Sequence, residues 1–302
     1  MAIKNLKINK LKCIFLLKEI TASPPILNKQ KITTDINELN IGKEYKPYIK
    51  RFINKTSIDF NFRYPNEKLE TLKIKKHSNS DYLIRKNKIR LKKKKDIYHE
   101  LFHVFTLYKM DSNHIFSGFN QYGLLYDIAN SFDEGYTDLL TNRYFDDEIL
   151  YMIEANIVSK VELMLGKEKM RSMYTANDLI GLIEFLSKHS SKQEAIGFIT
   201  MMDKLDNYDY ESKEAINLMN ILSNYLVNVY LNFLAENYSL GIIDNADVNN
   251  ELSKFKDKFV KYAFDDKELK KEYLRSSDYL DITSKLSNSN FREELRKKVL
   301  TK

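Results

Sequence analysis

The sequence of 302 residues has one cysteine, Cys13, four prolines, eight glycines and no tryptophan. A single cysteine excludes an internal disulfide, so we expect a fold that forms in the reducing cytoplasm. The scarcity of proline and glycine excludes collagen-like and low-complexity sequences, while 43% hydrophobic residues can build a sizeable core. The frequent lysine, asparagine, isoleucine and tyrosine are typical of an AT-rich coding sequence and point to a low-GC bacterium.

Long hydrophobic runs are also missing. The apolar run at residues 13–17 is followed directly by Lys18 and Glu19, and it is too short for the apolar region of a signal peptide. No segment approaches the roughly 18 apolar residues that a membrane-spanning helix needs. We therefore expect a cytoplasmic protein with no membrane partner.

The net charge of +7 comes partly from a dense basic stretch at residues 85–95, RKNKIRLKKKK. Clustered lysines and arginines bind phosphates without sequence preference, so a basic nucleic-acid-binding protein is one interpretation. However, Ile89 and Leu91 alternate with charged residues as in a half-exposed strand, and lysine is common on exposed strand edges. We favour the strand, and nucleic acid remains the weaker choice of partner.

The motif that carries chemistry is HELFH at residues 99–103. On a helix, His99 and His103 lie four residues apart and leave the same face one turn apart, so both imidazoles can bind one small cation. Glu100 lies beside that face, where its carboxylate can act on a water molecule as a general base without binding the cation. Two imidazoles suit zinc better than calcium or magnesium, which prefer oxygen ligands. The motif therefore predicts Zn²⁺ as the cofactor.

A third zinc ligand must come from further along the chain. In metzincins it is a histidine six residues after the second motif histidine, with a glycine between, but Thr106 and Lys109 stand at those positions. His114 is a candidate, although it lies in a polar, turn-like stretch where a lone histidine is usually only solvated.

Glu134 is the better candidate for the third ligand. Residues 131–145 have helical spacing, and Asp138 follows Glu134 by one turn on the same face. The far nitrogen of a zinc-binding histidine usually donates a hydrogen bond to a carboxylate or a carbonyl group. Asp138 can take that role for His99.

Together, HELFH and the downstream segment 133–141 (DEGYTDLLT) resemble the gluzincin zinc metallopeptidases. With segment 117–121 (SGFNQ), they look like small gluzincin-like proteins of AT-rich bacteria, and the similarity spans about residues 96–145. The resemblance implies that Glu100 is the catalytic base and that Asp138 is a supporting carboxylate. The implied zinc ligands are His99, His103 and Glu134. Many gluzincins also use a downstream tyrosine or histidine to stabilise the oxyanion, for which no motif is present here. Tyr122, Tyr126 and Tyr136 are the candidates for this role.

We therefore expect a zinc-dependent metallohydrolase, a peptidase that cleaves peptide or protein substrates with a metal-activated water and a glutamate base. The alternatives are a catalytically silent zinc-binding interaction module and the basic nucleic-acid-binding protein described above. An enzyme needs Glu100 for turnover, whereas a silent module needs only the metal ligands.

The expected fold is α+β and mostly helical. Residues 1–145 should form an N-terminal lobe with a small sheet and the zinc-binding helices, and residues 146–302 a helical C-terminal lobe, with the cleft between them. Asp96 is the expected N-cap of the motif helix, and residues 104–133 form a long connecting loop. The other predicted elements are a helix at 35–52, strands at 57–63, 69–75 and 82–92, and helices at 149–165, 177–188, 192–204, 213–237, 246–262 and 267–275.

Overall fold

The computed structural model describes residues 31–111, 114–123, 127–209, 212–253, 281–286 and 288–301. In these residues the chain is a mostly helical α+β protein, as the sequence predicts, and it has two small sheets where the sequence predicts one. It divides into two compact units. We call residues 31–151 with Lys167–Ile180 the sheet unit, and the described residues of 152–166 and 181–301 the helical unit. The predicted division of the chain at residue 145 stays a prediction.

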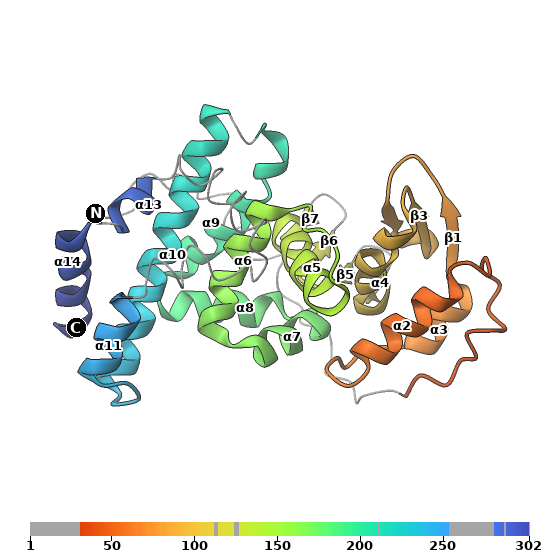
Figure 1. Ribbon diagram of the computed structural model, residues 1–302, viewed down its shortest axis with the longest axis horizontal. Coiled ribbons are helices and arrows are strands. Elements are labelled where there is room, and N and C mark those ends of the chain that lie inside the picture. Colours follow the sequence, from red (N-terminus) through yellow and green to blue (C-terminus); the bar gives the residue numbers. More distant parts are fainter. Residues whose placement is uncertain are drawn as a thin grey trace. The chain divides into compact units, whose positions relative to one another are not determined.

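The sheet unit contains both sheets and the motif helix. Its helices are α2 (Lys46–Thr56), α3 (Pro65–Thr71), α4 (Ile97–Thr106), α5 (Asn130–Phe145) and α7 (Lys167–Ala176), with 3-10 turns η1 (Ile84–Lys86) and η2 (Lys94–Asp96). Strands β1 (Lys73–Lys76), β3 (Lys88–Leu91) and β2 (Asp81–Leu83) form a sheet in that order. Strands β4 (Tyr108–Lys109), β5 (Ile115–Ser117), β6 (Asn120–Tyr122) and β7 (Asp127–Ile128) form an antiparallel sheet. In Figure 1, α4 lies between α5 and the first sheet.

Helix α4, which carries the HELFH motif, is held by a cluster of aromatic rings. Leu101, Phe102 and Phe105 are fully buried. Phe52 of α2 packs against Phe102 and Phe105 at ring distances of 4.9 and 5.2 Å, and Phe145 of α5 stacks on Phe52 at 5.6 Å. Because each buried aromatic ring contributes about 1.5–3 kcal/mol, this cluster fixes the orientation of the motif helix.

Asp96 does not have the expected role. Its backbone precedes α4, but its side chain makes no capping hydrogen bond to that helix. It accepts hydrogen bonds from the Lys93 backbone N–H at 3.2 Å and from the Ser80 hydroxyl. Asp96 therefore caps the 3-10 turn η2, which comes directly before α4.

Two predictions near the N-terminal end of the sheet unit are wrong. The helix expected at residues 35–52 begins only at Lys46, where Pro47 stands in the first turn. The strand expected at 57–63 does not form. Phe60 and Phe62 are buried on either side of exposed Asn61, as the alternation indicates, but they pack into the aromatic cluster rather than pair with a strand.

The connection between the motif helix and α5 is not a loop but the four-stranded sheet β4–β7. Strands of two or three residues are too short to show alternation in the sequence. Helix α7 is also unexpected. It buries Met170, Met173 and Tyr174 on one face.

The remaining helices up to residue 253 follow the predicted pattern, whereas those at 281–286 and 289–300 were not predicted. They are α6 (Met152–Leu165), α8 (Leu179–Lys188), α9 (Lys192–Met202), α10 (Lys213–Ser239), α11 (Asn245–Ser253), α13 (Asp281–Leu286) and α14 (Ser289–Leu300), with a 3-10 turn η3 (Leu205–Asn207). Gly166 follows α6 with φ +84°, as expected for a C-terminal cap. The helix predicted at 267–275 lies outside the described residues. In the described parts of the chain, none of the helices has the length and apolarity needed to cross a bilayer.

A buried lysine joins α3 to the motif helix. Lys68 is 8% exposed, and its Nζ donates a hydrogen bond to the carbonyl oxygen of Phe105 at 2.9 Å. Burial and, to a smaller extent, nearby Arg63 lower the pKa of Lys68 to about 7. An unfolded lysine has a pKa of about 10.4. Between pH 7 and about 10.4, Lys68 is therefore protonated in the unfolded chain and largely neutral in the folded protein. Stability should therefore rise with pH across this interval.

We predict that Lys68→Met flattens the pH dependence of stability. Between pH 7 and about 10, the unfolding free energy of the wild type should rise more steeply than that of the variant, by at most about 1.4 kcal/mol per pH unit. Denaturant titrations at several pH values measure both slopes. Lys50→Met, at an exposed position, should keep the wild-type slope, and equal slopes for all three proteins would contradict the prediction.

Candidate metal centre

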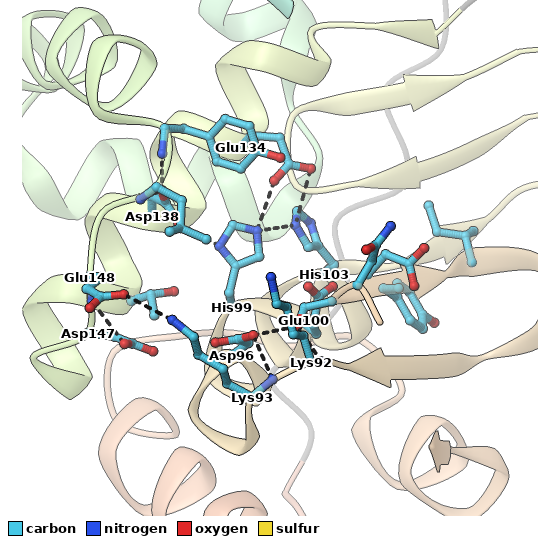
Figure 2. Close-up of a pocket in the computed structure, with 18 of the residues that line it drawn as sticks. Lys92, Lys93, Asp96, His99, Glu100, His103, Glu134, Asp138, Asp147 and Glu148 are labelled. Carbon is cyan, nitrogen blue, oxygen red and sulfur yellow. Dashed lines mark hydrogen bonds and ion pairs between the residues drawn. The ribbon is translucent and has the colours of Figure 1, made fainter. Parts of the chain in front are cut away.

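Three of the predicted residues converge on one point. His99 and His103 project from α4, and Glu134 projects from the facing helix α5 (Figure 2). The Nε2 atoms of the two histidines are 3.0 Å apart. Glu134 Oε2 lies 2.9 Å from His99 Nε2, and Glu134 Oε1 lies 3.6 Å from His103 Nε2. Of the described histidine, cysteine and acidic residues, these form the one group able to hold a metal ion, with ligand atoms within 4.8 Å of one another.

The donor set fits a zinc ion. Atoms bound at about 2.0–2.1 Å to a tetrahedral zinc ion lie about 3.3 Å apart, close to the three separations observed here. Two imidazole nitrogens and one carboxylate are a common set for a zinc site with an open position. His99 and His103 also turn their Nδ1 atoms toward carboxylates, which leaves both Nε2 atoms for the ion.

Asp138 supports His99, as the sequence predicts, and it also holds a second segment. Its Oδ1 lies 2.7 Å from Nδ1 of His99. Its Oδ2 accepts hydrogen bonds from the backbone N–H groups of Leu150 and Tyr151, both at 2.6 Å. One carboxylate therefore orients a ligand histidine and anchors the chain that follows α5.

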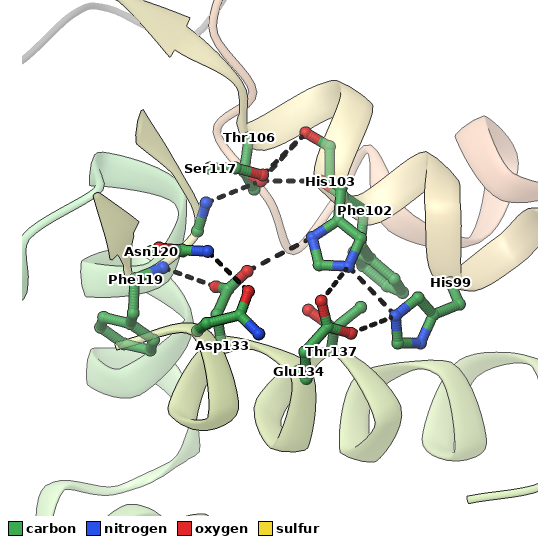
Figure 3. Close-up of polar contacts among 12 residues, drawn as sticks. His99, Phe102, His103, Thr106, Ser117, Phe119, Asn120, Asp133, Glu134 and Thr137 are labelled. Atoms are coloured by element: carbon green, nitrogen blue, oxygen red, sulfur yellow. Dashed lines mark hydrogen bonds and ion pairs between the residues drawn. The ribbon is translucent and has the colours of Figure 1, made fainter. Parts of the chain in front are cut away.

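Asp133 stands in the corresponding place beside His103, a role that the sequence analysis missed. Its Oδ2 lies 3.3 Å from Nδ1 of His103, but neither atom has a hydrogen-bond partner of good geometry. Its other oxygen accepts a hydrogen bond from the backbone N–H of Phe119 at 2.6 Å (Figure 3). A small rotation of the His103 ring would align the unsatisfied pair, as binding of an ion at Nε2 requires.

The turn between β5 and β6 holds Asp133 in place. Gly118 has φ +54°, and a Cβ atom there would lie 1.9 Å from Asp133 Oδ1 and 2.3 Å from Cε2 of Tyr174. Its N–H donates to the Thr106 hydroxyl at 2.9 Å, and Ser117 Oγ donates to the carbonyl oxygen of His103 at 3.2 Å. The turn thus packs closely against both the end of α4 and Asp133, and only glycine fits there.

The charged groups of the cluster shift one another's pKa values. Burial lowers the pKa of His99, but Asp138 and Glu134 outweigh this effect and raise it well above its usual value. The same opposition, between burial and the nearby carboxylates, raises the pKa of His103 to about 10. Burial raises the pKa of Glu134, but His103 and His99 outweigh it and lower the pKa. A metal ion that binds here must displace protons from the imidazoles.

The cluster opens into a cavity of about 440 Å³ that Glu100 also lines. Burial raises the pKa of Glu100 to about 7, although the two imidazoles oppose this shift. The described walls belong to the sheet unit alone, whereas the sequence suggested a cleft between two lobes. At the exposed rim of the cavity, Glu148 pairs with Lys93 at 3.8 Å (Figure 2). Lys95, which does not line the cavity, pairs with Asp147 at 3.1 Å and with Glu148 at 3.2 Å.

The other candidate residues lie in different places. Tyr122 lines the cavity, as does Tyr151, which the sequence analysis did not identify. Tyr136 is fully buried in the core, and Tyr126 lies outside the described residues. His114 is exposed, and its ring contacts Asp111 rather than the cluster. No sequence motif identifies Tyr151, because its position at the cavity depends on the course of the chain after α5.

Comparison with known proteins gave no match: no family model, no curated protein and no solved structure is similar to this chain. The chemical interpretation of the cluster therefore rests on its own geometry.

We predict that Asp138→Asn weakens zinc binding by about 10- to 100-fold. An amide has only one oxygen, so it cannot accept hydrogen bonds from His99 and from the Leu150 and Tyr151 N–H groups together as the carboxylate does. Competition with a zinc chelator measures the affinity, and circular dichroism checks the fold. Asp147→Asn at the rim should bind zinc as the wild type does, and unchanged affinity in Asp138→Asn would contradict its role.

Gly118→Ala should both destabilise the protein and weaken zinc binding. The methyl group forces Asp133 and Tyr174 to move, and the left-handed backbone adds strain, for a total of about 1–3 kcal/mol. Gly166→Ala is the matched control, because Gly166 also has positive φ but has no atom within 4 Å of the added Cβ. The control should lose about 1 kcal/mol and keep its zinc affinity. Equal zinc affinity in both variants would show that the turn does not position Asp133.

Proposed function

We propose that this protein is a zinc-dependent peptidase of the gluzincin type. The observation that supports the proposal most is that His99, His103 and Glu134 meet within 4.8 Å at a cavity that the Glu100 carboxylate shares. Helical spacing explains the two histidines, but the third donor comes from a separate helix. The resemblance of the HELFH and DEGYTD segments to gluzincins agrees with this arrangement.

In this proposal His99, His103 and Glu134 hold the zinc ion. A bound zinc ion polarises a substrate carbonyl and lowers the pKa of water to about 7. Three protein ligands leave one coordination position open toward the cavity. The cavity of about 440 Å³ has the size of a small-ligand site, which suits a few residues of a peptide.

Glu100 is the general base. Its side chain is buried at the cavity and is not one of the three converging ligands. It takes a proton from the attacking water and delivers it to the departing amine, so that the peptide C–N bond breaks as the new C–O bond forms. Tyr122 lines the same cavity, and burial raises its pKa well above the usual value, so its hydroxyl keeps the proton that it would donate to the carbonyl oxygen.

The cytoplasm is the proposed location, since the single cysteine leaves the fold independent of oxidising conditions. A peptidase in that compartment must restrict its access to proteins. At the proposed site, the cavity-lining residues Lys93 and Glu148 form an ion pair at 3.8 Å.

We predict about one zinc ion per chain. His103→Ala and Glu134→Ala should lose most of this zinc, because each removes one of three ligands. Elemental analysis of the purified proteins measures the content. His114→Ala serves as the control and should keep the wild-type content, whereas wild-type zinc in either ligand variant would remove that residue from the ligand set.

Glu100→Gln should keep zinc but lose hydrolysis, because the substitution preserves the size of a side chain that is not a ligand. General base catalysis contributes about 10² to 10⁴ in rate, and the carboxylate also positions the water, so we expect a loss near the upper value. A broad peptide library, assayed with and without chelator, provides the measurement. Glu148→Gln at the rim should retain activity.

Two outcomes would contradict the enzymatic proposal. Equal cleavage by the wild type and Glu100→Gln would exclude the proposed base. Zinc in both proteins without cleavage of any peptide would instead identify a zinc-stabilised interaction module.

A further inference from the structure

The positive charge of the chain is concentrated in one short segment. Residues 73–95 contain eleven lysines and arginines but only one acidic residue, Asp81. This excess is larger than the net charge of +7 for all 302 residues, so the rest of the chain is net acidic. The segment forms the three-stranded sheet β1-β3-β2 and the turns η1 and η2 of the sheet unit.

The strand register places four of these cations on one face. Lys73 pairs with Lys88, and Lys75 pairs with Arg90, in the parallel ladder between β1 and β3. Paired residues point to the same side of a sheet, and residues two apart share that side. We call Lys73, Lys75, Lys88 and Arg90 the basic face. The intervening residue of β3, Ile89, is fully buried on the opposite side.

The four cations of the basic face repel one another. Like charges opposite one another destabilise a strand pair, and both cross-strand pairs here are cation against cation. Arg90 has a carboxylate partner, Asp81 of β2. Across the described residues, Lys73, Lys75 and Lys88 have no acidic group within 4.0 Å. The folded protein therefore retains an electrostatic cost that an anionic partner would offset.

Protection of exposed strand edges does not explain this pattern. Edge lysines prevent strands from pairing with other chains, which accounts for Lys73 and Lys75 on the edge strand β1. However, Lys88 and Arg90 lie on β3, the central strand of the sheet. Their charge gives no protection to an edge.

The composition of the face favours phosphate as the partner. Protein interfaces are depleted in lysine and enriched in aromatic residues, whereas the basic face has three lysines, one arginine and no aromatic ring. The large exposed hydrophobic residues of the described chain all lie outside 73–95, and Leu83, which pairs with Lys88, is only partly exposed. A basic patch without such an anchor holds a membrane only weakly.

We propose that the basic face binds the phosphate backbone of double-stranded nucleic acid without reading its sequence. Single strands are held mainly by bases that stack on exposed aromatic rings, and this face has none. Tyr82, the nearest aromatic residue, pairs with Ile89 on the opposite side of the sheet, and its hydroxyl donates to Asn87 at 2.8 Å.

The four cations of the basic face are not among the candidate metal ligands, but Asp81, the partner of Arg90, also lines the cavity. Helix α4 contacts β2 and β3 (Figure 1), and the buried residue Ile89 faces the side of the sheet away from the basic face. None of the four cations lines the cavity, so the face does not use the metal ligands. Binding should not depend on metal, and it goes beyond the peptidase activity proposed above.

The test measures fluorescence anisotropy of a short labelled DNA duplex with the full chain at several salt concentrations. Four phosphate contacts predict a slope of log K against log salt of about −3.6. Lys73→Gln with Lys75→Gln and Lys88→Gln should reduce the slope by about 2.7 and weaken binding at low salt at least about tenfold. The triple variant should unfold at the same temperature as the wild type or higher, because it removes repulsion.

The matched control is Lys167→Gln with Lys192→Gln and Lys213→Gln. These lysines are the exposed first residues of α7, α9 and α10. Their replacement changes the net charge by the same amount as the triple variant of the basic face. The control should bind the duplex as the wild type does. A chelator should not change the affinity of either protein for the duplex. Binding of duplex RNA with the same slope would show that the shared backbone chemistry is recognised.

Four results would overturn the proposal: no duplex binding by the wild type at low salt, an equal loss of affinity in the control, tighter binding of single strands than of duplex, or tighter binding of phosphatidylserine vesicles than of duplex. None of these results bears on zinc content or peptide cleavage, so the two proposals can fail independently.

Discussion

The polar contact between α4 and α5 is the constraint on which the rest of the sheet unit depends. On α5, Asp133, Thr137 and Asp138 are at most 1% exposed. Burying such groups costs free energy unless they are hydrogen-bonded. Asp138 meets His99 and two backbone N–H groups, Asp133 accepts from Phe119, and Thr137 Oγ1 lies 2.8 Å from the Tyr174 hydroxyl. The contact of Asp138 with His99 joins α5 to α4, and the other contacts join α5 to the β5–β6 turn, to the chain after α5 and to α7.

This arrangement concentrates charge in a small buried volume. His99, His103 and Glu134 converge on one point beside Glu100, and the carboxylates raise the pKa of both imidazoles above its usual value. In the proposed function a zinc ion displaces protons from the imidazoles and satisfies the three donors together. Binding free energy would then also stabilise the fold, since the ligands are brought together only in the folded chain. The aromatic cluster around Phe52 provides the rigid support that such a site requires.

Predictions from side-chain spacing were correct where all the residues concerned lie on one helix. The helix of the HELFH motif and the pair Glu134 and Asp138 follow from spacing within single helices, and both helices form. The alternation at residues 57–63 indicated which side chains are buried, but burial in an aromatic cluster and burial in a sheet leave the same pattern. The connector at 104–133 was taken for a loop because its strands are too short for any periodicity.

The sequence by itself determined which side chains of the candidate site share a helix face, because a helix of 3.6 residues per turn sets the relative placement of side chains four residues apart. It identified His99 and His103 as partners and Glu134 and Asp138 as another pair. Only the tertiary structure decided that Asp133 meets His103, that Asp138 also anchors the chain at Leu150, and which residues wall the cavity. These contacts join separate elements, so they depend on how α4 packs against α5 and the β5–β6 turn. The same holds for the basic face, since strand register alone sets lysine opposite lysine.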